Sequence, residues 1–244
     1  FRNDEKPNAK RFGEFTPAYC TLASHLIEEI SEYLPPSQTK IILLIRNPIY
    51  RNISNFKLHK KKKNYSEKDV RESGIFDFIR HMERPGFRHR TDYPDIIQKW
   101  VGVYGTENLK ILTFDELTTK PIANLKDLAR FLEVDPEWFT EDTVPTEKVN
   151  TSPQIDTPPL FRAYLAWRWL PMVRKVNVLL EGRVEDWVLE LEMINQNLSL
   201  IRRSQFRALK GLARIWNAKQ VRNLNRRFQR LLRVMKERRE EALS

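Results

Sequence analysis

The segment of residues 40–56 constrains the fold more than any other part of the sequence. Its first part, KIILLI, is a continuous apolar run that is rich in β-branched residues and too short for a buried helix. Such a run is typical of a parallel-sheet strand that is covered on both faces. Asn47 then suits a helix N-cap and Pro48 the first helical position. The apolar residues that follow at helical spacing are Ile49, Ile53 and Phe56. The sequence therefore predicts a tight turn from a buried strand into a helix.

The flanking segments continue this alternation of strands and helices. Apolar residues at helical spacing predict helices over residues 21–34, from Tyr93 to Tyr104, and from Pro121 onwards. Residues 109–114, LKILTF, form a second short apolar run and predict a second buried strand. Because strand, helix, strand and helix follow one another, we expect an α/β fold with a parallel sheet.

A basic stretch interrupts this pattern between the first strand and the second. Residues 57–90 contain 11 Lys or Arg against 5 Asp or Glu, and we expect a surface loop with short helices there. If the stretch borders a cleft, it would concentrate an anionic acceptor such as an acidic polysaccharide. A solvated loop explains the same charges equally well, and both interpretations stay open.

The last part of the chain has a different composition. The segment NTSPQIDTPP, residues 150–159, indicates a linker or a lid, and after it the sequence becomes helical. We therefore divide the chain into an α/β domain of residues 1–155 and a helical extension of residues 156–244. Apolar residues repeat in steps of three and four over residues 184–201 and again over 221–235, which predicts two long helices packed as a hairpin.

The excess of positive charge belongs to this extension. The formal net charge is +11, and the last 43 residues carry 14 Lys or Arg and only 3 Glu. Nucleic acid, anionic lipid or an acidic protein could each bind such a helix. Few aromatic residues interleave the basic face, so base stacking is poorly supported. We favour a protein partner, or a second copy of the chain, bound through residues 184–240.

Composition excludes several other classes of protein. A chain of 244 residues can bury a core without disulfides, and the single cysteine, Cys20, cannot form an internal one. One cysteine slightly favours the cytoplasm, whereas a Golgi-type lumen is the alternative if a membrane anchor precedes Phe1. The four histidines show no metal-ligand spacing, so we expect no metal. No run of 18 apolar residues predicts a membrane span.

Arg46 and Ser54 are the residues with the clearest chemical potential. A strand-to-helix turn offers backbone amides to an anion, and Arg46 at the strand end can add charge-assisted hydrogen bonds. Ser54 follows eight residues later, about two helical turns away, and can present its hydroxyl to the same region. Together they suit a phosphate clamp. Spacing alone also allows Arg46 to cap a sheet edge and Ser54 to be a solvated helix residue.

Three segments resemble one enzyme family in order and spacing. The stretch KIILLIRNPIYRNISNF is similar to the second phosphate-binding motif of the sulfotransferases that use 3′-phosphoadenylyl sulfate (PAPS). GEFTPAYC, residues 13–20, resembles the strand and turn before this motif in the carbohydrate and bacterial members. Residues 100–134 are similar to the helix, strand, acidic turn and helix after it. The resemblance covers roughly residues 12–140.

The resemblance implies a fold, a reaction and a donor. The fold would be a P-loop-NTPase-like parallel sheet, an N-terminally incomplete sulfotransferase fold followed by the helical extension. Arg46 and Ser54 would grip the 3′-phosphate of PAPS and of the product adenosine 3′,5′-bisphosphate. The reaction would move a sulfuryl group to a hydroxyl of an acceptor, which we expect to be a carbohydrate.

The sequence also departs from the family pattern. The family's first motif, a Gly-Thr-rich loop with Lys or Arg that holds the 5′-phosphosulfate, is absent and would lie upstream of Gly13. The general base usually lies in that region too, so we expect activity only when the upstream segment is present. Phe15 stands where many relatives carry Lys. The alternatives are an inactive sulfotransferase-like subunit that joins an assembly through its basic tail, and a kinase-like enzyme with a similar sheet.

Four further residues are candidates for supporting roles. Glu14 could act as a base if burial raised its pKa, although a structural role at the strand end is favoured. Arg51 could contact the donor phosphate or pair with a neighbouring carboxylate, and we favour the ion pair. Asp115 and Glu116 are expected to cap and orient the turn after the second strand.

Overall fold

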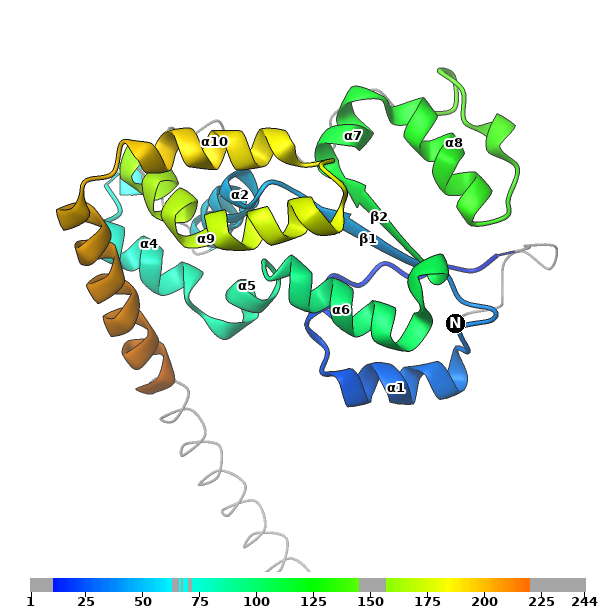
Figure 1. The fold of residues 1–244 in the computed structure, drawn as a ribbon, viewed down its shortest axis with the longest axis horizontal. Helices are drawn as coiled ribbons and strands as arrows, with labels where there is room; N and C mark the ends of the chain where they lie inside the picture. The colour runs from blue at the N-terminus through cyan, green and yellow to red at the C-terminus, as the bar shows by residue number, and fades with distance from the viewer. Residues whose placement is uncertain (1–10, 63–65, 67, 70–71, 145–156, 220–244) are drawn as a thin grey trace, which may run out of the picture.

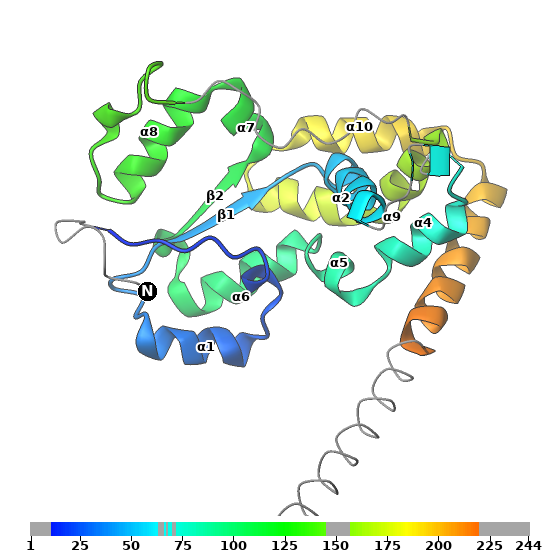
Figure 2. The ribbon, with the colours of Figure 1, turned by 180° about the vertical axis from the view of Figure 1, so that it is seen from behind.

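Two parallel strands lie at the centre of the molecule, with helices around them (Figures 1 and 2). The computed structural model describes residues 11–62, 66, 68–69, 72–144 and 157–219. β1 (Ile41–Ile45) pairs with β2 (Leu109–Thr113) in parallel register, so that Ile41 lies opposite Leu109. The predicted α/β fold with a small parallel sheet is confirmed.

The helices expected around the two strands form close to their predicted bounds. They are α1 (Ser24–Tyr33), α2 (Pro48–Lys62), α6 (Tyr93–Tyr104) and α8 (Pro121–Phe131). A further short helix, α7 (Phe114–Thr119), forms where only a turn was expected. Three short 3₁₀ turns accompany them, at Tyr19–Thr21, Thr106–Asn108 and Pro136–Trp138. The second strand ends one residue earlier than predicted, because Thr113 caps a helix that begins at Phe114.

The basic stretch of residues 57–90 is more ordered than a surface loop. Its described part contains the end of α2 and two further helices, α4 (Ile75–Met82) and α5 (Pro85–His89). α4 buries Phe78, Ile79 and Met82 in the core. The short helices predicted for this stretch are confirmed, but α4 belongs to the core and not to a surface loop.

The part beyond residue 157 begins with a helical hairpin. α9 (Pro159–Leu179) and α10 (Glu185–Gln196) lie side by side, and a third helix covers residues 200–219 (Figure 1). The expected continuous helix over residues 184–201 is therefore wrong, because α10 ends at Gln196. The linker expected over 150–159 lies mostly outside the described residues, and the helix expected over 221–235 lies wholly outside them.

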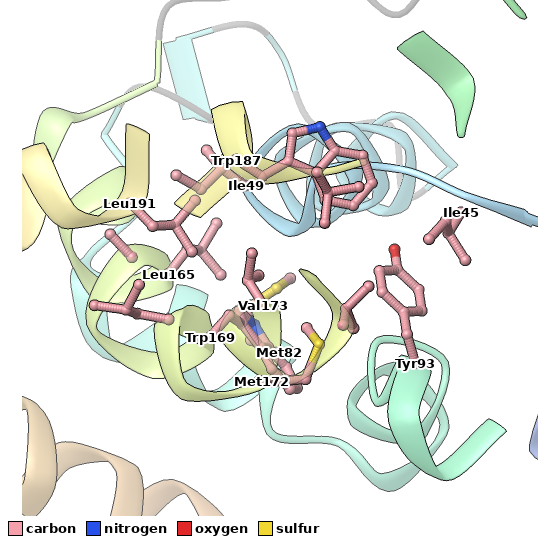
Figure 3. Packing of buried hydrophobic residues seen from close by; sticks show 14 of the residues in the cluster. Ile45, Ile49, Met82, Tyr93, Leu165, Trp169, Met172, Val173, Trp187 and Leu191 are labelled. Carbon is pink, nitrogen blue, oxygen red and sulfur yellow. The ribbon is translucent and has the colours of Figure 1, made fainter. Parts of the chain in front are cut away.

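One buried cluster joins the hairpin to the α/β part. Figure 3 shows Leu165 and Val173 of α9 and Leu191 of α10 facing the same interior as Ile45 and Ile49. The rings of Phe78 on α4 and Phe161 on α9 stack with centroids 4.0 Å apart. The boundary expected near residue 155 lies in undescribed chain, and the helices after it share their core with those before it.

The expectation that both faces of β1 are covered is wrong. Ile45 is buried, but Ile42 and Leu44 are 44% and 43% exposed. Side chains alternate along a strand, so Ile42 and Leu44 share the face opposite to Ile45. The described residues leave that face of β1 partly open to solvent.

Candidate functional site

The candidate site lies at the carboxyl ends of β1 and β2, where the chain turns into α2 and α7. In open α/β sheets, ligands bind outside the carboxyl ends of the strands. Arg46 and Asn47 form the first turn, whereas Thr113 leads directly into α7. The two turns are neighbours because Ile45 pairs with Thr113.

Arg46 is held at its backbone, and its side chain is partly buried. The Tyr93 hydroxyl donates to the Arg46 carbonyl at 2.7 Å, and the Arg46 N–H lies 3.4 Å from the same hydroxyl. Burial raises the pKa of Tyr93, so the hydroxyl keeps its proton at neutral pH. The Arg46 guanidinium lies 4.4 Å from the centre of the Phe114 ring. Within the described part of the chain, no carboxylate pairs with it. This partly buried cation can therefore accept an anionic ligand.

Asn47 and Pro48 reduce the number of backbone donors at the start of α2. Asn47 is only 2% exposed, and its Oδ1 accepts the Ile49 N–H at 2.9 Å, which confirms it as the N-cap. Pro48 has no N–H to offer. The cap uses the Ile49 N–H and Pro48 offers none, so this turn has fewer backbone amides for an anion than expected. Side chains such as Arg46 therefore gain importance for holding an anion there.

Glu190 of α10 covers the same turn. One of its carboxylate oxygens accepts from Asn47 Nδ2 at 2.8 Å. The other accepts from the Tyr50 hydroxyl at 2.9 Å and from Arg162 Nη2 at 2.6 Å. Asn47 is thus fixed at both ends of its side-chain amide.

Ser54 and Arg51 extend the candidate site along α2. Ser54 is partly buried, two turns after the start of the helix. Arg51 Nη1 donates to the hydroxyl of the buried Thr91 at 2.8 Å. The favoured ion pair of Arg51 does not form with any carboxylate among the described residues. A threonine hydroxyl takes the place of the expected carboxylate.

Glu14 lacks the burial and the raised pKa that its role as a general base would require. It is exposed, and its carboxylate accepts from the Thr16 hydroxyl at 2.7 Å and from the Tyr19 hydroxyl at 2.9 Å. These hydrogen bonds, the one from Thr16 first, lower the pKa of Glu14 instead of raising it. No strand forms over residues 13–20, where the resemblance implied a strand and a turn, and Phe15 is 84% exposed.

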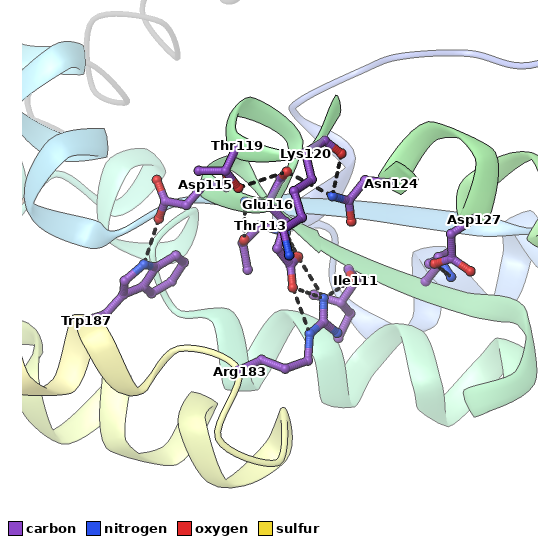
Figure 4. Close-up of polar contacts among 11 residues, drawn as sticks. Ile111, Thr113, Asp115, Glu116, Thr119, Lys120, Asn124, Asp127, Arg183 and Trp187 are labelled. Atoms are coloured by element: carbon purple, nitrogen blue, oxygen red, sulfur yellow. Dashed lines mark hydrogen bonds and ion pairs between the residues drawn. The ribbon is translucent and has the colours of Figure 1, made fainter. Parts of the chain in front are cut away.

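The β2–α7 turn is built as predicted by its acidic residues (Figure 4). The Thr113 hydroxyl accepts the Glu116 N–H at 3.1 Å, and Glu116 accepts the Thr113 N–H at 2.8 Å, which completes a capping box. Burial would raise the pKa of Glu116, but this backbone hydrogen bond and Arg183 hold the pKa below its ordinary value. The predicted capping role of Glu116 is confirmed.

Two residues of the hairpin hold this second turn from outside. Trp187 Nε1 donates to Asp115 at 2.8 Å, and Arg183 binds both Glu116 oxygens as well as the Ile111 carbonyl (Figure 4). The sequence contained the acidic residues of this turn, but it gave no sign of partners some 70 positions away. Long-range pairs of this kind leave no local pattern.

Two surface cavities lie away from Arg46 and Ser54. One, of about 440 Å³, is bounded by α9, α10 and residue 203, and the other, of about 420 Å³, by β2, α7, α8 and Arg183. Across the described ranges, no three His, Cys, Asp or Glu side chains gather into a possible metal site. Within the same ranges, no helix combines the length and the apolar character that a bilayer crossing requires.

Comparison with known proteins assigns the family. The model of the sulfotransferase domain matches residues 16–152, more than half of the chain. This chain belongs to the sulfotransferase family. Members of that family generally use PAPS. The hairpin residues Arg183, Trp187 and Glu190 lie outside the matched region.

A solved structure shows the same fold. The crystal structure of a sulfotransferase from Alicyclobacillus acidocaldarius matches this sulfotransferase with a TM-score of 0.51 and 20% identity, over 69% of this chain. The match covers 64% of that chain, so this sulfotransferase spans less than two thirds of its length. No curated protein matches the sequence.

Proposed function

We propose that this protein transfers a sulfuryl group from PAPS to a hydroxyl of a carbohydrate or similar acceptor. The proposal rests on Arg46, a partly buried cation at the carboxyl end of β1. Within the part of the chain that the structure describes, no carboxylate pairs with this cation. It occupies the position at which the family motif places its phosphate-binding arginine. Membership of the family supports the choice of PAPS as donor.

In the proposed complex, side chains of β1 and α2 hold the 3′-phosphate of the nucleotide. Arg46 donates charge-assisted hydrogen bonds, Ser54 donates its hydroxyl, and Arg51 adds a second cation whose position Thr91 fixes. Phe114 supports the flat face of the Arg46 guanidinium. These contacts bind and orient the donor, and they bind adenosine 3′,5′-bisphosphate in the same way.

The transfer itself is an in-line displacement at sulfur. The acceptor oxygen forms a bond to sulfur while the bond from sulfur to the 5′-phosphate oxygen breaks. The acceptor hydroxyl gives its proton to a base, and adenosine 3′,5′-bisphosphate leaves with the electron pair of the broken bond. The described residues contribute binding and positioning of the donor, which make the displacement effectively intramolecular.

The basic stretch before α6 supports an anionic acceptor. Arg80, Arg84 and Arg88 lie on or beside α4 and α5, and all three are partly exposed. Burial and the charge of Arg80 lower the pKa of Arg84, as expected where cations cluster. A positive field of this kind raises the local concentration of an acidic polysaccharide.

Isothermal titration calorimetry on the full-length protein tests the donor. We expect binding of adenosine 3′,5′-bisphosphate and much weaker binding of ATP, which has no 3′-phosphate. Arg46→Ala removes charge-assisted hydrogen bonds worth about 1.5–3 kcal/mol, so its dissociation constant should rise more than about tenfold. Failure of the wild-type protein to bind this nucleotide, together with no transfer of labelled sulfate from PAPS to polysaccharides, would refute the proposal.

A second candidate role is assembly with a protein partner. The helix of residues 200–219 exposes an apolar stripe of Ile201, Leu212 and Ile215, at 73%, 56% and 65% exposure. The same residues contain six Lys or Arg and no Asp or Glu, so a second copy would be repelled and a partner helix with acidic flanks would be attracted. Leu212→Glu should abolish capture of such a partner without changing nucleotide binding, and unchanged capture would exclude this surface.

A further inference from the structure

The helical hairpin holds both turns of the candidate donor site at once. Its residues Arg183 and Trp187 bind the β2–α7 turn, and Glu190 binds the β1–α2 turn. All three come from one short segment that lies outside the region matching the family model. A segment that touches both turns can set the distance between them.

Of these three residues, Glu190 is the one that binds the turn containing Arg46. Its side chain is 20% exposed, and three donors converge on its carboxylate. One donor, Asn47, directly follows Arg46 and is buried. Another, Tyr50, lies on the first turn of α2, one turn before Ser54. Glu190 therefore binds two side chains, Asn47 and Tyr50, of the segment between the two clamp residues.

The charge of Glu190 does not conflict with a phosphate nearby. Arg162 neutralises the carboxylate at 2.6 Å, and the amide and hydroxyl donors satisfy its remaining lone pairs. Without Glu190, the buried Nδ2 of Asn47 would lose its acceptor, which is costly for a group away from water. Loss of this acceptor would loosen the Asn47 side chain, which directly follows Arg46 and caps α2 through its Oδ1.

We propose that Glu190 is a positioning residue for the 3′-phosphate subsite, acting through Asn47 and Tyr50. The inference rests on the proposed function, because it assigns Arg46 and Ser54 to that phosphate. Glu190 itself does not touch the nucleotide. Its loss should therefore weaken recognition of the 3′-phosphate selectively, and leave contacts to the rest of the nucleotide unchanged.

The test compares two nucleotides that differ only in this phosphate. Calorimetry on full-length wild-type protein and Glu190→Gln gives dissociation constants for adenosine 3′,5′-bisphosphate and for AMP. The variant should bind the bisphosphate about tenfold more weakly, since one charge-assisted network is lost, and should bind AMP as the wild type does. Glu190→Asp keeps the charge and should recover part of the affinity for the bisphosphate.

The matched control lies two residues further along the same helix. Glu192 pairs with the exposed Arg174 and has no contact with the turns among the described residues, so Glu192→Gln should leave both dissociation constants unchanged. Equal weakening of both nucleotides by Glu190→Gln would indicate a structural role and overturn the inference. If Glu190→Gln does not fold, Glu190→Asp replaces it under the same criterion, with a smaller selective loss expected.

The two hypotheses fail in different ways. If the wild-type protein does not bind adenosine 3′,5′-bisphosphate, the proposed function is wrong. If the wild type binds it and Glu190→Gln binds it equally well, only the role of Glu190 is wrong.

Discussion

The buried carboxylate of Glu83 should make an unusually large contribution to stability. Its side chain is only 1% exposed, at the end of α4, where Arg168, Arg214 and the Tyr164 hydroxyl donate to it at 2.7 to 2.9 Å. These contacts join α4, α9 and the helix of residues 200–219. In Glu83→Gln, one carboxylate oxygen becomes an NH₂ group that faces an arginine donor, and two buried or half-buried cations lose their counter-charge.

The expected loss follows from the burial of the three partners. Removing one member of a buried ion pair costs about 3–5 kcal/mol. Arg168 is 19% exposed but Arg214 is 42% exposed, and solvent screens the second pair. We therefore expect the lower end of the range, about 3 kcal/mol. For a domain of this size, that loss corresponds to a decrease in Tm of about 6–12 °C.

The pH dependence of stability provides an independent check. Burial alone would raise the pKa of Glu83, but the charge of Arg168 and the hydrogen bonds from Arg214, Arg168 and Tyr164 outweigh it and hold the pKa below its ordinary value of 4.5. A carboxyl group with a lowered pKa stabilises the fold fully above the pKa of the unfolded chain. This stability is lost as the pH falls through the folded pKa. The difference between wild type and Glu83→Gln should therefore be constant above pH 4.5 and shrink below it.

Chemical denaturation followed by circular dichroism measures both effects. Glu192→Gln serves as the control, because its ion pair with Arg174 is exposed and should be worth less than about 1 kcal/mol. If Glu83→Gln costs no more than this control, or if the difference grows in acid, the argument from burial and counter-charge is wrong.

Three smaller perturbations test the β2–α7 turn, the end of α6 and the contact between Arg46 and Phe114. Thr113→Val removes the hydroxyl that accepts the Glu116 N–H and should lower the free energy of unfolding by about 1 kcal/mol in urea denaturation; no change would show that the cap is dispensable. Gly105→Ala should cost about 1–3 kcal/mol in the same assay, because φ is +79° there and a Cβ would lie 2.4 Å from a carboxylate oxygen unless it moved. Phe114→Ala removes the ring beneath Arg46 and should weaken binding of adenosine 3′,5′-bisphosphate about two- to fivefold in calorimetry, from a cation–π contact of about 0.5–1 kcal/mol; stronger binding would contradict the supporting role of the ring.

The parts of the fold that the sequence predicted are those with local causes. The run KIILLI, the cap at Asn47 and the proline at position 121 each act over a few residues, and each element begins where these residues indicate. The capping box of Thr113 and Glu116 is equally local. Short helices were expected in residues 57–90, but the burial of α4 was not, because it depends on packing against α9.

The parts of the site that the sequence missed depend on distant partners. Tyr93 fixes the backbone of Arg46 from 47 positions away, and Glu190 binds Asn47 from 143 positions away. Spacing rules cannot reveal such pairs. The expectation of open amides at the start of α2 overlooked a local effect, since Asn47 caps the Ile49 N–H and Pro48 has none.

Residues 183–190 come late in the chain, and this order affects how the protein folds during its synthesis. A ribosome makes β1, α2 and β2 well before it makes residues 183–190, so a nascent chain carries its strand ends for a time without Arg183, Trp187 and Glu190. During that interval the buried Asn47 amide lacks its acceptor on α10. The two strand-end turns thus acquire their final contacts only after the hairpin has been synthesised and has docked.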